Sequence, residues 1–339
     1  MDYLLLIAIL VSLVSTLLFL PRWISKTRKI DLTWRDMNKF GHPKNVSASG
    51  GIIVVFAFAI STLIYLGLKT FIYAPSIHQT KILAVLAVVL FYALIGLTDD
   101  LLGWKHGGLT KRSRILLAIL ASIPLAVINA GNSTVSLPFF GGINLGIYFP
   151  LIVVPLAVAF VATTYNFLAG FNGLETGLGI MILSFASFVA YVTGSPWLAV
   201  IGLCMVASLI VFLFFNWFPA KVFSGDVMTY AIGALFISMA ILGNFERIAI
   251  IVFIPFAIEA ILKVLRGKGR KHSFGKPDKD NHLEMPYKKI YGLTHFSIWF
   301  LKKIKRNATE VRVVFLIYIM QLVFILLAII YLMLRGGLV

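Results

Sequence analysis

The sequence predicts an all-α polytopic membrane protein, and three of its properties indicate this class. Of its 339 residues, 60% are hydrophobic and 13% are charged, whereas soluble domains contain about 45–50% apolar and about 25% charged residues. Continuous apolar stretches of helix-spanning length recur along the chain, in place of the short alternating strands of an outer-membrane barrel. Only one cysteine, Cys204, is present. A soluble enzyme, a disordered chain and a secreted disulfide scaffold are therefore excluded.

Apolar runs of about 17–25 residues, the length needed to cross a bilayer, predict about ten transmembrane helices in a single domain covering residues 1–339. No basic residue precedes the first run and no small-residue cleavage site follows it, so it is interpreted as a retained span and not as a signal peptide. The expected spans cover residues 3–21, 51–69, 82–98, 115–131, 149–167, 177–194, 197–215, 227–243, 247–265 and 313–334.

Lysine and arginine residues are distributed very unevenly between these spans. If residue 1 lies outside the cell, the inner loops hold 26 of the 30 basic residues, and the outer side holds four. Basic loops remain on the cytoplasmic side of a membrane, which places both termini outside and a cytoplasmic substrate-binding loop at about 266–311. The net charge of +17 therefore follows from membrane topology and does not indicate nucleic-acid binding.

With this orientation, several acidic and amide side chains fall together at the inner ends of the spans. They are Asp99, Asp100, Asn166, Asn172, Glu175, Asp226 and Glu259. Acidic residues near a span end cost free energy and tend to be functional. Carboxylates and amides from several helices, beside a basic loop, suit a divalent cation that holds an anionic, diphosphate-like substrate.

Each of these features also has a structural interpretation. An acidic pair is typical of a solvated helix end as well, and Asn and Gly at a span end are typical of a turn. Glu259 is compatible with a helix cap or an ion pair. The basic segment 302–306 follows Trp299 and Phe300 at helical spacing, which is typical of an interfacial membrane anchor.

Four segments on the predicted inner face are more specific, because they occur together and in order. They are Asp36-Met37-Asn38-Lys39, Leu97–Gly103, Asn166–Gly177 and Asn216–Asp226. In these segments the sequence resembles the polyprenyl-phosphate N-acetylhexosamine-1-phosphate transferases, most closely the archaeal and eukaryotic branch that makes dolichyl-diphosphate-GlcNAc from UDP-GlcNAc. The resemblance implies a multi-pass cell-membrane enzyme that transfers N-acetylhexosamine-1-phosphate from a UDP-sugar to a polyprenyl or dolichyl phosphate and releases UMP, the first step of lipid-linked glycan assembly.

The resemblance also implies an active site on the cytoplasmic face, with Mg²⁺ as cofactor and Mn²⁺ as an alternative. It assigns the metal to Asn166 and Asp226, and catalysis to Asp99, Asp100 and Arg114. The implied substrate contacts are Asn172 with uridine, Phe223 with uracil, Arg270 with the diphosphate and His272 with the sugar. Glu175 is also implied to bind substrate, and Lys111 is the alternative to Arg114 as the residue that holds phosphate.

Two positions depart from the family pattern. In the last inner loop the branch carries the sequence R-H-R-x-P, and the matching positions here read Arg270, Lys271 and His272, with Phe274 in place of the proline. The second arginine of the pattern is therefore a histidine in this chain. A Pro-Glu pair that is usual in the family reads Val46-Ser47.

Two other functions are weighed against this one. A phospho-MurNAc-pentapeptide transferase shares the aspartate pair, but it would carry an H-x-H-H motif and an aspartate at the position of Ala169, and neither is present. An ion-coupled transporter would show paired halves and charges near the bilayer midplane, whereas these polar groups lie at one face. The sequence does not identify the hexosamine or the length of the lipid. It also leaves open whether the lipid phosphate attacks directly or a phospho-enzyme forms, and whether the protein is a homodimer.

Overall fold

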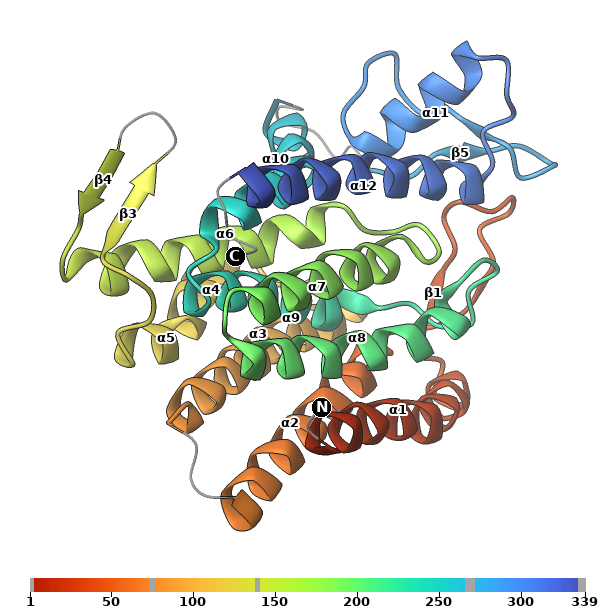
Figure 1. Ribbon diagram of the computed structural model, residues 1–339. Coiled ribbons are helices and arrows are strands. Elements are labelled where there is room, and N and C mark those ends of the chain that lie inside the picture. The colour runs from red at the N-terminus through yellow and green to blue at the C-terminus, as the bar shows by residue number, and fades with distance from the viewer. Residues whose placement is uncertain (1–2, 74–76, 138–140, 266–271, 335–339) are drawn as a thin grey trace.

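The computed structural model describes residues 3–73, 77–137, 141–265 and 272–334 (Figure 1). Within these ranges, nine helices are long and apolar enough to cross a membrane, and the sheet consists of two-stranded antiparallel hairpins. The all-α polytopic class is thereby confirmed. The helices are α1 (Tyr3–Lys29), α2 (Gly51–Leu68), α3 (Gln79–His106), α4 (Lys111–Ala121), α5 (Ile123–Val127), α6 (Val154–Phe167), α7 (Leu174–Val192), α8 (Pro196–Asn216), α9 (Gly225–Leu242), α10 (Glu246–Leu265), α11 (Leu293–Lys303) and α12 (Glu310–Leu334). The strands are β1 (Thr33–Arg35), β2 (Lys44–Ser47), β3 (Thr134–Leu137), β4 (Gly141–Asn144), β5 (Lys276–Pro277) and β6 (Leu283–Glu284).

The expected span at residues 115–131 is the one that differs from the sequence-based prediction. It is divided between α4 and α5, which are 11 and 5 residues long and meet at Ser122. Pro124 lies in the first turn of α5, where its ring and its missing N–H prevent α4 from continuing as one regular helix. Both short helices pack against α3 and α6, so this part of the bundle is a broken helix pair.

α9 is the central helix of the bundle, and every residue from Val227 to Leu242 is buried. Glycines allow its neighbours to approach it at backbone distance. A Cβ added at Gly96 of α3 would lie 2.4 Å from the backbone of Asp226, and one added at Gly233 of α9 would lie 2.7 Å from the Cα of Ala162 in α6. α3 and α6 are therefore packed directly on α9, which fixes the start of α9 relative to the end of α3.

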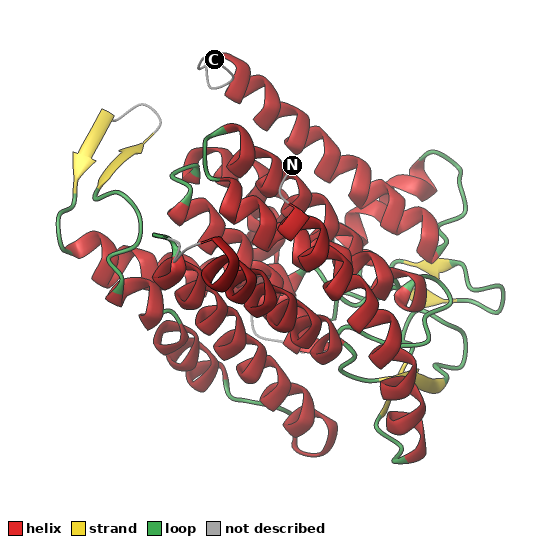
Figure 2. Ribbon diagram, turned by 60° about the horizontal axis from the view of Figure 1, so that its bottom comes forward, coloured by secondary structure: helices red, strands yellow, loops and turns green. Residues whose placement is uncertain are grey.

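One end of the bundle holds most of the short elements. The hairpin of β1 and β2, the strand β5 and the helix α11 all lie at this end, whereas the hairpin of β3 and β4 lies at the opposite end (Figures 1 and 2). α1 ends next to β1, and the first residue of α12, Glu310, bonds to Asn172 at the same end. Since α1 ends and α12 begins here, their other ends project to the opposite side.

Candidate active site

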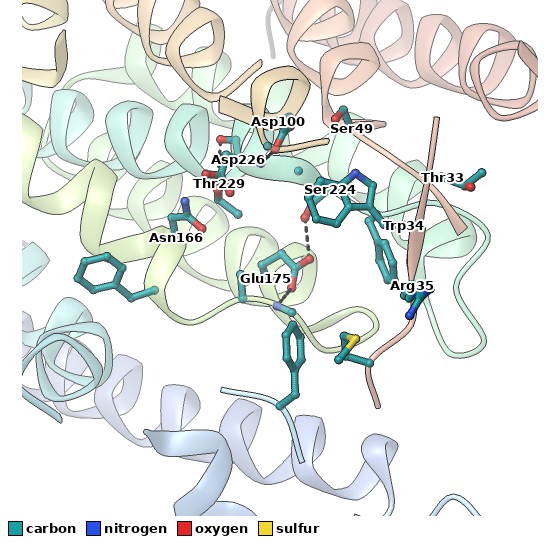
Figure 3. A pocket seen from close by; sticks show the side chains of 18 of the residues that line it. Thr33, Trp34, Arg35, Ser49, Asp100, Asn166, Glu175, Ser224, Asp226 and Thr229 are labelled. Atoms are coloured by element: carbon teal, nitrogen blue, oxygen red, sulfur yellow. Dashed lines mark hydrogen bonds between the residues drawn. The ribbon is translucent and has the colours of Figure 1, made fainter. Parts of the chain in front are cut away.

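A cavity of about 750 Å³ opens at this loop-rich end of the bundle. Its acidic wall is formed by Asp100 of α3, Asn166 of α6, Glu175 of α7 and Asp226 of α9. Four different helices thus contribute one polar side chain each (Figure 3). The convergence that the sequence predicted for the inner span ends is therefore present in the folded chain.

The Asp100 carboxylate caps the start of α9. Its Oδ1 accepts a hydrogen bond from the backbone N of Asp226 at 2.8 Å, and its Oδ2 lies 3.5 Å from the backbone N of Val227. The first N–H groups of a helix lack intrahelical partners, and the helix dipole favours an anion beside them. Gly225 makes this approach feasible, because its φ is +72° and a Cβ there would lie 2.1 Å from the Asp100 Oδ2. Only glycine fits at this position.

Asp99 and Asp100 are neighbours in sequence but point to different partners, as expected for adjacent residues about 100° apart on a helix. Asp99 is buried, accepts a hydrogen bond from the backbone N of Leu109 at 2.6 Å, and has its Oδ2 2.8 Å from an Arg114 guanidinium nitrogen. Asp99 therefore fixes Arg114 behind the cavity wall, while Asp100 faces the cavity.

Glu175 joins the loop before α7 to the start of α9. Its Oε1 accepts a hydrogen bond from the Ser224 hydroxyl at 2.6 Å, and its Oε2 accepts one from the backbone N of Gly170 at 3.4 Å (Figure 3). Both of its oxygens are thus engaged by the protein, although the residue lines the cavity. Glu175 holds the two segments that carry Asn166 and Asp226 in register.

The donor set of the acidic wall fits a divalent metal ion. Asp226 lies within electrostatic reach of Asp99, Asp100 and Arg114, so three carboxylates share one guanidinium that is already paired with Asp99. The excess negative charge at the cavity suits a cation. Carboxylate and amide oxygens, here those of Asp226, Asp100 and Asn166, are the hard ligands that Mg²⁺ prefers.

Tyr230 connects the proposed metal ligands to the ion pair behind them. It follows Asp226 by four residues on α9 and is buried. Its hydroxyl interacts with the Asn166 amide and with the Arg114 guanidinium. Asn166 is therefore oriented by a neighbour from α9 and not only by the end of its own helix.

Basic and aromatic side chains form the rest of the cavity wall. Trp34 and Arg35 of β1 lie across the cavity from Asn166 and Asp226 (Figure 3). Lys263 of α10 also lines the cavity, donates to a carbonyl at the end of α6, and has its Nζ 5.0 Å from the centroid of a phenylalanine ring there. A cavity that combines acidic groups with cations and aromatic rings suits an anionic ligand that has a planar group.

A buried polar network supports the cavity from behind and joins three distant segments. Glu310 Oε1 accepts a hydrogen bond from the backbone N of Asn172 at 2.8 Å, and Asp36 Oδ2 accepts one from the Asn172 amide at 3.2 Å. Lys39 pairs with Asp36 and lies 3.8 Å from the Glu310 Oε2. The Asn38 side chain completes the network by accepting a hydrogen bond from the backbone of the last loop at 3.1 Å.

The structure brings most of the residues implied by the resemblance to one place. Asp100, Asn166, Glu175, Phe223 and Asp226 line the cavity. Asp99 and Arg114 lie directly behind them as an ion pair.

Three other residues implied by the resemblance do not line the cavity. Asn172 belongs to the buried network and does not line the cavity. Lys111 is exposed as the first residue of α4, and His272 is exposed beside Phe274, which lines the cavity. Arg270 lies outside the described residues.

Several cavity and network residues were missed by the sequence interpretation. Trp34, Arg35 and Lys44 lie in the first hairpin, which the resemblance covered only by the motif at residues 36–39. Two of them could have been identified from the sequence, because a charged residue at the end of an apolar span costs free energy. They are Glu310, the first residue of the last span, and Lys263, a cation in an apolar span.

From the sequence, Glu259 was compatible with either a helix cap or an ion pair, and the structure shows that it forms both. Its Oε2 accepts a hydrogen bond from the backbone N of Leu293, the first residue of α11, at 2.6 Å. Its Oε1 lies 3.6 Å from the Lys263 Nζ. Glu259 thereby joins α10 to α11 and to the cation of the cavity wall.

Comparison with known proteins identifies relatives over nearly the whole chain. Residues 82–244 match glycosyl transferase family 4. A protein of Saccharolobus solfataricus, provisionally named a UDP-N-acetylglucosamine–dolichyl-phosphate N-acetylglucosaminephosphotransferase, is 33% identical over 329 residues, which cover 96% of this chain and 94% of that protein. A Dictyostelium discoideum protein of the same name is 30% identical over 282 residues, covering 72% and 68%. A phospho-N-acetylmuramoyl-pentapeptide-transferase of Clostridium botulinum is 26% identical over 272 residues, covering 76% and 80%.

We predict that Lys39→Met destabilises the protein, because Asp36 and Glu310 would then lie buried without their shared cation. The expected loss in the free energy of unfolding is about 3 kcal/mol, measured by thermal unfolding in detergent. The double variant Lys39→Met/Asp36→Asn is expected to recover part of the loss. Lys44→Met is the matched control, since its pair with Asp31 is exposed and is expected to contribute far less to stability. Equal losses in the two lysine variants would contradict this account of the network.

Proposed function

The chain belongs to the polyprenyl-phosphate N-acetylhexosamine-1-phosphate transferases of glycosyl transferase family 4, and from this premise we propose the substrates and the role of each wall of the cavity. The enzyme transfers N-acetylglucosamine-1-phosphate from UDP-N-acetylglucosamine to a dolichyl or related polyprenyl phosphate and releases UMP. The observation that carries this function is the 33% identity to a relative of that name over 96% of the chain. Relatives named phospho-N-acetylmuramoyl-pentapeptide-transferase match at 26–30% identity, below the 33% of that relative, and an ion-coupled transporter is excluded by the family.

The reaction joins an oxygen of the lipid phosphate to the β-phosphorus of the UDP-sugar. The bond between that phosphorus and the oxygen shared with the α-phosphate breaks, and UMP leaves with the electron pair. We propose that Asp100, which faces the cavity, orients the lipid phosphate or accepts its proton. Arg114, held by Asp99 at 2.8 Å, supplies positive charge next to the reacting groups.

The remaining cavity residues are proposed to bind the nucleotide. Arg35, Lys44 and Lys263 can neutralise the diphosphate, and Phe223 presents an aromatic ring to the uracil. Asn166 and Asp226 are proposed to hold Mg²⁺, or Mn²⁺ in its place, which would shield the charge of the diphosphate and the leaving group. Since the polar groups lie at the end of the bundle, the lipid tail can remain in the bilayer while its phosphate reaches the cavity.

We also propose that the enzyme resides in the cell membrane with this cavity on the cytoplasmic side. The uneven distribution of basic residues supports this orientation. The end of α1, which lies at the same end of the bundle as the cavity, carries four basic residues: Arg22, Lys26, Arg28 and Lys29. A soluble UDP-sugar would then reach the active site directly from the cytoplasm.

We predict that the purified protein releases UMP from UDP-N-acetylglucosamine when a polyprenyl phosphate is present, and does so faster than with other UDP-hexosamines. Asp226→Asn is expected to abolish most turnover and to weaken the dependence on Mg²⁺, measured by titrating the metal in the same assay. A mere capping role for Asp226 predicts the opposite, since asparagine caps a helix about as well as aspartate. Turnover with a UDP-sugar other than an N-acetylhexosamine, and none with UDP-N-acetylglucosamine, would refute the assignment.

We predict that the two adjacent aspartates contribute unequally. Asp100→Asn is expected to lower turnover by about 10²–10⁴-fold, the range of a lost general base. Asp99→Asn acts through Arg114, so its effect is expected to be smaller and not to add to that of Arg114→Gln in the double variant. Additive effects of Asp99→Asn and Arg114→Gln on turnover would show that the two residues act separately.

We predict that the two ends of the bundle are reached from opposite sides of sealed cells. In a Cys204→Ser background, Asn144→Cys on β4 is expected to react with an impermeant thiol reagent from outside. Lys279→Cys, in the last loop, is expected to react only after permeabilisation. Both positions are exposed, so the comparison depends on the membrane alone. Labelling of Lys279→Cys in intact cells would place the cavity on the outer face.

A further inference from the structure

α11 has two apolar faces, and only one of them is covered by the part of the chain that the structure describes. Leu293, Ile298 and Leu301 are buried against the bundle. Trp299 and Phe300 lie on another side of the helix and are 39% and 36% exposed. Phe296, half-buried, stacks on Phe300 with ring centroids 6.1 Å apart, which extends the exposed apolar surface along the helix. Among the residues that the structure describes, nothing covers this surface fully.

The attachment of α11 shows at what depth this surface lies. Leu293, its first residue, donates its backbone N–H to the Glu259 carboxylate at 2.6 Å. Glu259 lies six residues before the end of the membrane-spanning helix α10, which is about 9 Å along the axis at about 1.5 Å per residue. After α11, six residues lead into Glu310 at the start of the span α12. These attachments hold α11 beside the ends of α10 and α12, where a headgroup layer about 5–8 Å thick would adjoin the hydrocarbon core.

The charge next to this surface is strongly positive. Lys303, Lys305 and Arg306 are exposed, and the Lys303 Nζ lies 4.9 Å from the centroid of the Trp299 ring. Lys302 pairs with Glu284 of β6, so it is partly neutralised. Aromatic side chains beside exposed cations characterise helices that lie in the membrane plane and attract anionic lipids. A bilayer surface that contains anionic headgroups therefore complements α11 in both apolar character and charge.

α11 is also connected to the cavity. The Thr294 hydroxyl donates a hydrogen bond to the Ser273 carbonyl at 2.7 Å. Phe274, the next residue, lines the cavity, and its ring packs so closely on Gly170 that a Cβ there would lie 2.8 Å away. A shift of α11 would therefore displace Phe274 from the cavity wall.

We propose that α11 is an in-plane anchor that binds anionic lipid headgroups and thereby holds the segment of residues 272–275 against the cavity. Anchoring follows from the depth, exposure and charge of α11. The consequence for turnover rests in addition on the proposed transferase function. Two measurements separate these parts, because one of them needs no turnover.

The first measurement tests the anchor alone. In a Cys204→Ser background, Phe300→Cys carries an environment-sensitive fluorophore, and Lys288→Cys, an exposed position of the same loop outside α11, is the control. Both are reconstituted in nanodiscs with brominated acyl chains, made either of phosphatidylcholine or of equal parts phosphatidylcholine and phosphatidylglycerol. We expect several-fold stronger quenching at position 300 than at position 288, and more in the anionic discs. Equal quenching at the two positions would overturn the anchor.

The second measurement tests the link to the cavity. The wild type is expected to turn over faster in the anionic discs than in the neutral discs, and Lys303→Gln/Arg306→Gln is expected to lose this difference. Each basic residue at an anionic surface strengthens attachment about fivefold. Lys288→Gln/Lys289→Gln removes the same charge outside α11 and is expected to retain the difference. An identical rate of the wild type in both discs, or an equal loss in both double variants, would overturn the coupling even if the anchor itself is confirmed.

Discussion

The contact between the end of α3 and the start of α9 is the constraint on which the rest of the site depends. Asp100 accepts a hydrogen bond from the backbone of Asp226 at 2.8 Å, and glycines at positions 96 and 225 remove the side chains that would keep the two helices apart. The same carboxylate therefore caps α9 and faces the cavity. Because a helix start has unpaired N–H groups and a positive dipole end, an anion is stabilised there without a salt bridge. This gives the enzyme a fixed acidic centre at one end of the helix bundle.

The charges around this centre are arranged in layers. Asp100 and Asp226 face the cavity, the pair of Asp99 and Arg114 lies behind them, and the network of Asp36, Lys39 and Glu310 supports the neighbouring wall. Uncompensated burial of each charge would be costly, and each inner carboxylate has a cation or backbone N–H partner. At the cavity surface, Asp100 and Asp226 bring two acidic groups together, which a divalent metal ion would balance. The paired charges behind the cavity thus stabilise the fold, and the acidic groups that face the cavity remain available to a ligand.

The cavity is assembled from both membrane-embedded and surface segments. α3, α6, α7 and α9 supply the acidic wall, while the first hairpin and the segment at Phe274 close it from the loop side. In the proposed reaction, the helical part would hold the reacting groups in place while a lipid phosphate arrives laterally. The loop part would bind the soluble nucleotide. A reaction between a lipid and a water-soluble sugar nucleotide requires such a boundary position, and Glu259 joins the two parts through α10 and α11.

The fold class, the spans and the identity of the acidic centre could be predicted from the sequence, because each depends on local features: the length of an apolar run, the position of basic loops, and short motifs such as Asp99-Asp100. One span was wrong in its continuity, since Pro124 divides it into α4 and α5. The tertiary structure alone decided which of the two aspartates faces the cavity, and it placed Asn172 in a buried network with Asp36 and Glu310 instead of on the cavity wall. It also added Arg35, Lys44 and Lys263 to that wall. These outcomes depend on how distant segments pack, because the direction of a side chain and the neighbours it meets across helices are set by helix rotation and backbone approach, which no short stretch of sequence specifies.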